Sequence, residues 1–284
     1  MKTKELYLLI TMSFFPISNL IHAQQLEVEG DLQVNGRITG VMNPVNDQDA
    51  ATKAYIDQMS EMMLDAGLNG VVSDIDNNVY KTIKIGTQVW MAENLKTTKY
   101  NDGTNIQNIV GEVAWGGLST AAYCWYNDIN SNSERFGALY NFHVVAATNS
   151  LNVCPEGWSI PSESDWLVLT NFLTNNGYGY EGSGSDIGKA LASRFRWTSD
   201  GAAGNVGNDL GSNNSSGFSS LPAGYRVDDG GFDDDGIEGY FWSSTEDSGN
   251  ATDGVFMLLS NYSANFTNSS ENKNYGMSVR CLRD

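Results

Sequence analysis

Basic residues are scarce in this chain. Its 284 residues include 16 Lys and Arg against 34 Asp and Glu, which gives a formal net charge of −18. Because binding to nucleic acid or to an anionic membrane surface needs clustered Lys and Arg, the composition excludes both as partners. The favoured explanation of the acidic excess is that it keeps an exported chain soluble; the alternative is that acidic loops bind a cation.

Long apolar runs are also lacking, and no stretch reaches the roughly 20 residues that a membrane-spanning helix needs. The N-terminus instead has the pattern of a secretory signal peptide: Lys2 and Lys4, a short apolar run over residues 6–15, and the small residue Ala23. We expect cleavage after Ala23, so that residues 1–23 are the signal peptide. With no Cys near this site, we expect no lipoprotein anchor. The protein is predicted to be secreted or displayed at the cell surface, without a membrane span.

Cysteine is rare, and three residues in an exported protein leave one unpaired. We favour a disulfide between Cys154 and Cys281, because it would tie the middle of the domain to its last strand. The entropic model gives such a long loop a stabilisation of about 4–5 kcal/mol. Cys124 lies in an apolar, strand-like run and is predicted to be a buried thiol.

Motifs for catalysis are sparse. His143 is the one His after residue 23; a Cys124–His143 pair would suit nucleophilic chemistry, but a core His with satisfied hydrogen bonds is the favoured reading. No G-x-S-x-G motif occurs. Residues 177–182 match G-x-G-x-x-G but follow a predicted helix instead of a strand, which indicates a flexible loop. The sequence therefore predicts a protein that is not an enzyme.

Residues 24–70 read as a stem. Residues 24–41 alternate apolar and polar side chains between glycine turns, which predicts short strands. A helix is expected from about Asp47 or Asp49 to Leu64. It carries a three-four spacing typical of a coiled-coil seam at Thr52, Tyr55, Met59, Met62 and Ala66. Two heptads are short for a coiled coil, and an amphipathic helix that packs on the main domain is the alternative.

Residues 71–284 predict one α+β domain with two short helices, several short antiparallel strands and long loops. A hairpin is expected over residues 79–85 and 88–91. Ser162 and Asp165 form a capping-box pattern for a helix that ends near residue 173, and a second helix is expected over residues 187–194. Further strands are expected at residues 218–221, 240–244, 255–259 and 277–282.

Acidic residues gather in one Gly-rich stretch, residues 227–238, which we read as a loop. Ca²⁺ takes six to eight hard oxygen ligands, and turn-forming Gly lets carboxylates converge. The predicted ligands are Asp228, Asp229, Asp233, Asp235 and Glu238. The spacing is not that of an EF-hand, and a solvated acidic loop that also includes Asp234 is the alternative.

Aromatic residues are plentiful, with seven Trp and thirteen Tyr. Most lie in strand-like runs and are predicted to be core residues, as are Trp90, Trp125, Trp158 and Trp166. Others lie in or beside polar loops, where they could stack on a glycan or grip a protein partner. The predicted ligand-binding residues are Arg226, Phe232, Tyr240, Tyr262 and Phe266.

Seven runs of sequence carry a family resemblance, at residues 79–96, 100–103, 136–142, 154–158, 217–226, 240–246 and 278–281. From about Asp74 to Asp284 the chain resembles the Fibrobacter succinogenes major paralogous domain, found in exported proteins of Bacteroidetes and Fibrobacteres. That family implies no particular activity. Residues 48–55 resemble the segment that precedes a trimeric stalk in phage tail fibres and bacterial surface fibres, which implies a homotrimer through the stem.

The end of the chain, residues 239–281, resembles C-type-lectin-like domains of the formylglycine-generating-enzyme type. That resemblance implies a last strand near the first and ligand-binding loops between them, and a disulfide between Cys154 and Cys281 would suit such a topology. The paired Cys of those enzymes have no counterpart here, which argues against their activity.

We therefore expect a recognition or adhesion protein that binds a polysaccharide or a surface protein through the loops between Tyr225 and Asn274. Fold analogy does not transfer function. A cell-envelope hydrolase that uses loop carboxylates, or a purely structural fibre-tip module, are the alternatives.

Overall fold

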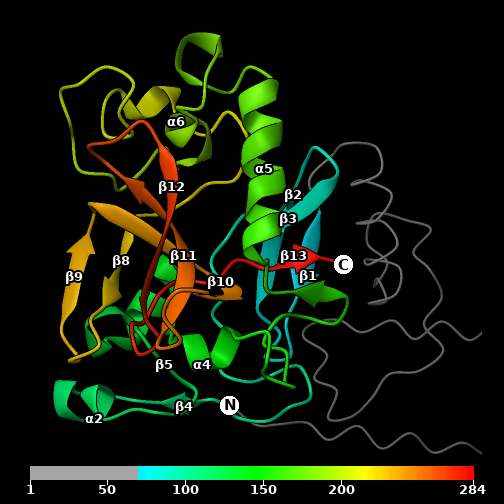
Figure 1. Ribbon diagram of the computed structural model, residues 1–284, viewed down its shortest axis with the longest axis vertical. Coiled ribbons are helices and arrows are strands. Elements are labelled where there is room, and N and C mark those ends of the chain that lie inside the picture. The colour runs from blue at the N-terminus through cyan, green and yellow to red at the C-terminus, as the bar shows by residue number, and fades with distance from the viewer. Residues whose placement is uncertain (1–69) are drawn as a thin grey trace, which may run out of the picture. The chain divides into compact units, whose positions relative to one another are not determined.

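The computed structural model describes residues 70–284, which form a mixed α+β architecture in which strands dominate (Figure 1). The predicted signal peptide and all but the last residue of the predicted stem, with its coiled-coil seam, lie outside the described residues. In the described part of the chain, no helix combines the length and the apolar character needed to cross a bilayer.

One five-stranded sheet joins the two ends of the domain. Its strands, in spatial order, are β1 (Val71–Ser73), β2 (Val79–Ile85), β3 (Gln88–Met91), β13 (Leu282–Arg283) and β7 (Trp158–Ser159). The predicted hairpin is confirmed with its bounds, and Gly86 supplies the positive φ of 63° in its turn. Leu282 pairs with Trp90 on one side and with Ser159 on the other. The last strand of the chain therefore lies inside this sheet, beside strands from its beginning.

A second five-stranded sheet carries most of the C-terminal half. Its strands, in spatial order, are β12 (Phe266–Asn272), β11 (Asp253–Ser260), β10 (Glu238–Glu246), β8 (Ala223–Arg226) and β9 (Phe232–Asp235). Strands β10, β11 and β12 are antiparallel neighbours, whereas β8 pairs in parallel with β10 at Gly224 and Gly239. The strands predicted at residues 240–244 and 255–259 are confirmed as the centres of β10 and β11.

The structure corrects other predicted strands. The strand expected at residues 218–221 is wrong: Ser220 makes one isolated bridge to Ala192, and the ladder starts at Ala223. Of residues 277–282, only Leu282 belongs to a strand, while Met277 and Ser278 make isolated bridges. The sequence predicts no strand at β12, because its residues after Phe266 are polar; in the structure they are exposed or half-buried. As an edge strand, it is held chiefly by backbone bonds to β11.

Short elements complete the domain. A small third sheet contains β4 (Gln107–Asn108), β5 (Ala122–Cys124) and β6 (Leu139–Tyr140). The α-helices are α2 (Glu112–Gly116), α3 (Ser133–Phe136), α4 (Phe142–Val145), α5 (Glu163–Asn175) and α6 (Gly188–Leu191). Single 3₁₀ turns occur at Tyr126–Asp128, Asn130–Asn132, Tyr180–Gly182 and Leu210–Ser212.

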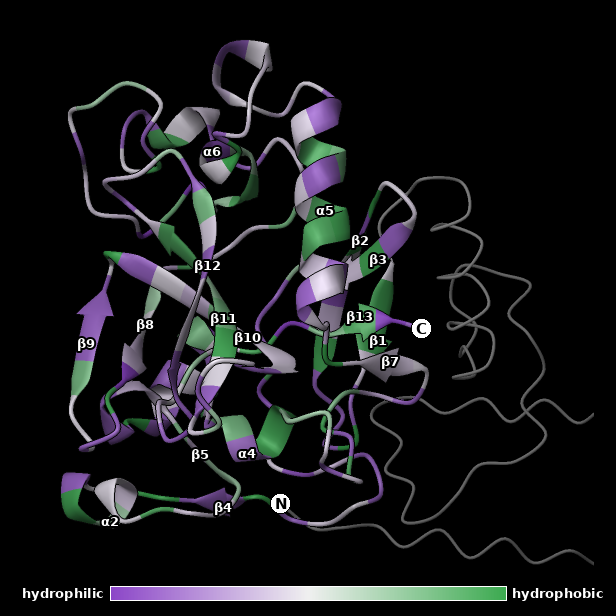
Figure 2. Ribbon diagram, in the orientation of Figure 1, coloured by the Kyte–Doolittle hydropathy of each residue, from purple (hydrophilic) through white to green (hydrophobic). Residues whose placement is uncertain are grey.

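Helix α5 is the long helix of the domain and packs against both five-stranded sheets. Its capping box is confirmed: the Asp165 N–H donates to Ser162 Oγ at 3.3 Å, and the Ser162 N–H donates to Asp165 Oδ2 at 2.8 Å. Hydrophobic and hydrophilic residues alternate along the helix (Figure 2). The buried Trp166 ring lies 4.5 Å from Trp90 on β3 and 6.1 Å from Phe241 on β10.

Helix α6 is shorter than predicted. It ends at Leu191, because Ala192 adopts extended backbone angles and bridges to Ser220 instead of continuing the helix to residue 194. The predicted core Trp residues behave as expected: Trp90, Trp158 and Trp166 are buried, and Trp125 packs against the core while partly exposed.

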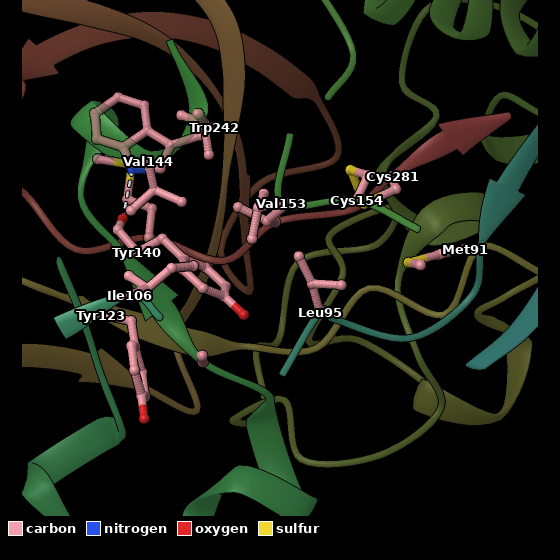
Figure 3. Close-up of a cluster of buried hydrophobic side chains, with 14 of the residues drawn as sticks. Met91, Leu95, Ile106, Tyr123, Tyr140, Val144, Val153, Cys154, Trp242 and Cys281 are labelled. Atoms are coloured by element: carbon pink, nitrogen blue, oxygen red, sulfur yellow. Dashed lines mark hydrogen bonds between the residues drawn. A yellow bond between two sulfur atoms is a disulfide. The ribbon is translucent and has the colours of Figure 1, made fainter. Parts of the chain in front are cut away.

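The predicted disulfide is confirmed. Cys154 and Cys281 are both buried and form a bond of 2.05 Å across a sequence separation of 127 residues, at the end of a hydrophobic cluster that includes Val153 and Leu95 (Figure 3). Cys124 is a buried free thiol, also as predicted. The bridge fastens the segment before β7 to the segment before β13.

Arg280 is a fully buried connection between distant segments. Its guanidinium donates to Asn94 Oδ1 at 2.7 Å and to the carbonyl of Met91 at 3.0 Å. It also donates to the carbonyls of Phe218 at 2.6 Å and Ser219 at 2.9 Å. Since backbone carbonyls and an amide satisfy this buried cation, Arg280 fixes the C-terminal segment to β3 and to the loop before β8.

Candidate functional site

Glu238 is the centre of a polar network on one face of the second sheet. It begins β10 directly opposite Ser260, the last residue of β11. The hydroxyls of Ser260 and Tyr262 donate to its Oε1, and the hydroxyl of Tyr240 donates to its Oε2. Burial would raise the pKa of Glu238, but these hydroxyl hydrogen bonds outweigh it and hold the pKa below its ordinary value. Glu238 is therefore an ionised carboxylate at neutral pH.

Asp234 is a second carboxyl in contact with the same hydroxyl. Its Oδ2 lies 3.2 Å from the oxygen of Tyr240. Burial first, and then the charge of Glu238, raise the pKa of Asp234 to about 6. A protonated Asp234 can donate to the Tyr240 oxygen, which in turn donates to Glu238. The three groups thus form a short hydrogen-bonded chain with one titratable proton near neutral pH.

Tyrosine rings border this pair of carboxyls. The Tyr225 ring on β8 lies 4.7 Å from the Tyr240 ring and 5.5 Å from the Tyr275 ring, stacked on the latter at an interplanar angle of 13°. Burial and the nearby Asp234 raise the pKa of Tyr225 to about 12. Tyr262 is 59 % exposed, and Tyr225 and Tyr275 are partly exposed. We call this set the tyrosine–carboxylate cluster: Tyr225, Asp234, Glu238, Tyr240, Ser260, Tyr262 and Tyr275.

Hydroxyl groups, and no Lys or Arg side chain, contact the two carboxyls of the cluster. The ion pairs seen within residues 70–284 lie elsewhere, as in Lys99–Asp76 and Lys273–Glu246. Buried carboxylates without a counter-cation rely on hydroxyl donors or on protonation, and both occur here. Exposed aromatic rings beside hydrogen-bond acceptors can bind a ligand that has an apolar face and hydroxyl or amine donors.

The predicted metal ligands do not converge. Residues 227–238 are not one loop: they form the turn before β9, then β9 itself, which pairs with β8, and the start of β10. Asp228 and Asp229 lie in the turn before β9, Asp233 and Asp235 are exposed on it, and Glu238 points into the hydroxyl network. The described residues contain no group of three or more His, Cys, Asp or Glu side chains placed to hold a metal ion. We therefore assign no Ca²⁺ site to these residues.

Arg226 is also placed differently from the prediction. Its side chain is fully buried and pairs with Asp128 at 3.0 Å. The guanidinium is enclosed by the rings of Trp115 and Phe232, each 4.5 Å away. Both Arg226 and Phe232 therefore hold β8 and β9 against the neighbouring segments, and we do not retain them as ligand-binding residues.

Of the remaining predicted ligand-binding residues, two join the cluster and one does not. Tyr240 and Tyr262 belong to the cluster. Phe266 is buried on the opposite face of the sheet, 5.8 Å from the Trp166 ring. Sequence reasoning missed Tyr225, Ser260 and Tyr275, and it gave Asp234 no role of its own. These residues come from β8, β9, β11 and the segment before β13, so no local spacing signals that they meet.

The conceivable Cys–His pair is not formed. Burial raises the pKa of Cys124 to about 12, so its thiol is not a nucleophile near neutral pH. His143 is partly buried, and its Nε2 lies 3.3 Å from Asn274 Oδ1. Its hydrogen bond agrees with the prediction of a satisfied His, but the side chain is half-buried and is not a core residue.

Comparison with known proteins identifies the family. No curated protein and no solved structure matches the chain. The family model of the Fibrobacter succinogenes major domain matches residues 83–283, which is more than half of the chain and nearly all of the described domain. On this match, the chain belongs to the Fibrobacter succinogenes major domain family.

Proposed function

We propose that this chain is an exported recognition protein, without enzymatic activity, that binds a polysaccharide or a surface protein through the tyrosine–carboxylate cluster. The observation that carries this proposal is the stack of Tyr225 on Tyr275 beside the Asp234–Glu238 pair and the exposed Tyr262. Tyrosine supplies apolar contact area and a hydroxyl at little entropic cost, and here the carboxyls fix the orientation of the tyrosine hydroxyls that border them.

The overall arrangement supports a C-type-lectin-like reading of the domain. The last strand lies beside β3, the Cys154–Cys281 bond closes the segments between them, and the cluster comes from the chain inside that closed loop. A disulfide is also typical of an oxidising compartment, which supports export by the signal peptide proposed at residues 1–23. If the proposed stem trimerises, three weak sites would act together and avidity would add to affinity.

A hydrolase is the second candidate function, and the same pair of carboxyls supports it. Glycoside hydrolysis uses one carboxylic acid with a raised pKa beside one ionised carboxylate, and Asp234 and Glu238 differ in this way. Against it, both carboxyls contact the same Tyr240 hydroxyl, and Glu238 accepts from three protein hydroxyls. These bonds occupy the oxygens that a substrate or an attacking water would need.

A binding screen of the full chain tests both functions. Glycan arrays and capture by surface-protein extracts should detect binding, and a labelled polysaccharide should stay intact during incubation. We expect Tyr262→Ala to weaken binding at least 10-fold. Tyr180→Ala, at a residue 36 % exposed in a separate 3₁₀ turn, is the matched control and should bind as the unmodified chain does. If the chain releases labelled fragments and Asp234→Asn abolishes that release, the function is hydrolysis and the recognition proposal is wrong. Loss of binding in EDTA would show that binding needs a divalent cation, for which the described residues contain no ready-made site.

A further inference from the structure

A groove of about 700 Å³ lies between helix α5 and strands β10, β11 and β12. Its size falls within the range of small-molecule and oligosaccharide sites. Met257 on β11 pairs with Asn268 on β12, and both side chains line the groove. Tyr240 pairs with the next residue along β11, Leu258, so the tyrosine–carboxylate cluster occupies the opposite face of the same sheet. The groove is therefore separate from that cluster.

The groove has an apolar floor and polar sides. Trp166, Met257 and Phe266 are buried side chains of the floor, and Leu167, which is 58 % exposed, forms part of its mouth. The sides carry hydroxyl and amide groups from both walls, including Thr170, Asn171 and Thr174 on α5 and Thr245 and Asn268 on the sheet. A ligand with an apolar face and many hydroxyls matches such a lining.

The groove is almost free of ionisable side chains. In a chain with 34 acidic residues, Glu163 is the one ionisable residue among those that line it. Its carboxylate already accepts a hydrogen bond of 2.8 Å from the Asn268 amide. Because the strongly acidic chain repels anions, and a single carboxylate is a weak site for a cation, the charge of the groove fits a neutral ligand.

One buried donor in the floor has no partner. The indole N–H of Trp166 makes no hydrogen bond within the described residues, although the side chain is fully buried. The nitrogen itself is enclosed by protein atoms, so a ligand in the groove packs against the Trp166 side chain and does not reach the N–H. The indole N–H therefore serves as a reporter of a ligand on the floor.

The walls favour a sugar over a peptide. An extended peptide binds chiefly through backbone hydrogen bonds to a free sheet edge. The helix wall offers none, since the backbone groups in the middle of α5 bond to one another. On the sheet wall β11 is paired on both sides, so a peptide could use only the outer edge of β12. The polar groups that line the groove itself are mostly side-chain hydroxyls and amides. We infer that the groove between α5 and β12 binds a short stretch of a neutral polysaccharide; this rests on the proposed recognition function and adds a second site to it.

Two substitutions on adjacent residues of α5 test the groove. Leu167→Trp places a large ring in its mouth, whereas Val168→Trp is the matched control because Val168 is 47 % exposed and faces the hairpin of β2 and β3 instead. Asn171→Ala removes an amide from the groove, and Asn175→Ala removes one from the same helix outside it. All four sites are exposed, so thermal unfolding of each variant should match the unmodified chain.

Affinity electrophoresis of the full chain should be run in galactomannan, hydroxyethyl cellulose and xylan as neutral polymers, and in alginate and polygalacturonate as acidic ones. We expect retardation by at least one neutral polymer and by neither acidic one. Leu167→Trp should weaken it at least 10-fold and Asn171→Ala about 5-fold, with both controls unchanged. In NMR spectra, the neutral polymer should also shift the Trp166 indole N–H signal.

Three outcomes would overturn the inference. In the first, Leu167→Trp leaves retardation by a neutral polymer intact and Tyr262→Ala abolishes it. That result would assign sugar binding to the tyrosine–carboxylate cluster and would still support the recognition function. Retardation by the acidic polymers alone would contradict the neutral groove. Retardation by none of the five polymers would rule out a polysaccharide as the ligand of the groove. Capture of a surface protein that depends on Tyr262 would then still support the proposed recognition function.

Discussion

Replacing Asp234 with Asn should remove a pH-dependent part of the domain's stability. The pKa of Asp234 is raised to about 6 in the folded protein, against 3.8 for an unperturbed Asp. The folded state therefore binds this proton more tightly than the unfolded state does. Ionised Asp234 destabilises the fold above pH 6, and the penalty is relieved as the pH falls from about 6 towards 3.8. Most carboxylates of a folded protein act in the opposite direction.

The size of the effect follows from the difference between the two pKa values. It would correspond to roughly 3 kcal/mol in a site fully shielded from solvent. Asp234 is only partly buried, and water screens its interaction with Glu238, so we expect about 1 kcal/mol. In a domain of this size, that free energy changes the melting temperature by about 2–4 °C.

Thermal unfolding from pH 7 to pH 4 provides the assay. Asn tolerates the left-handed backbone of residue 234, where φ is 62°, so Asp234→Asn should keep the local structure. At pH 7 the variant should melt about 2–4 °C above the unmodified chain, and the difference should vanish near pH 4. Glu156→Gln, at an exposed carboxylate before β7, controls for the general loss of negative charge. A variant that melts with or below the unmodified chain at pH 7 would refute the reasoning.

Three further changes probe the frame of the domain. Replacing Cys154 and Cys281 by Ala should cost about 4–5 kcal/mol, because the bond closes a loop over a separation of 127 residues, and denaturant unfolding under non-reducing conditions measures it. Arg280→Met should cost at least about 3 kcal/mol, since it removes the donor from three buried acceptors and one half-buried acceptor; an unchanged denaturation midpoint would contradict the contacts described. Gly224→Ala should cost more than 2 kcal/mol, because a Cβ there lies 2.2 Å from the carbonyl oxygen of the opposite strand and φ is +62°, whereas Gly201→Ala, in open space, should be neutral.

Local signals explain which elements could be predicted from the sequence. The hairpin of β2 and β3 follows from alternating apolar residues around a Gly turn, and the start of α5 follows from the Ser162–Asp165 capping box. Both signals lie within a few residues of the structure that they determine. Strand β12 has no such signal, because its polar side chains are typical of a loop and its backbone bonds depend on β11 being in place.

The site was harder to predict than the fold for the same reason. Acidic residues close in sequence indicated a metal loop, but they are divided among the turn before β9, β9 itself and the start of β10. Tyr225 and Tyr275 lie fifty residues apart and stack only once β8 and the segment before β13 are in place. Arg226 is predicted to bind a ligand, yet it pairs with Asp128, which comes from a turn almost a hundred residues away in sequence.

The position of β13 also orders the folding of the domain in time. Because a chain is made from its N-terminus, the hairpin of β2 and β3 must wait with an unpaired edge until Leu282, almost two hundred residues later, is available. Such long-range pairing is slow, and an open edge can pair with other chains. A chain that stops before residue 280 lacks Arg280, Cys281 and β13 together. Residues 280–283 are thus a condition for folding, and chains that stop before them should fail to reach the native state.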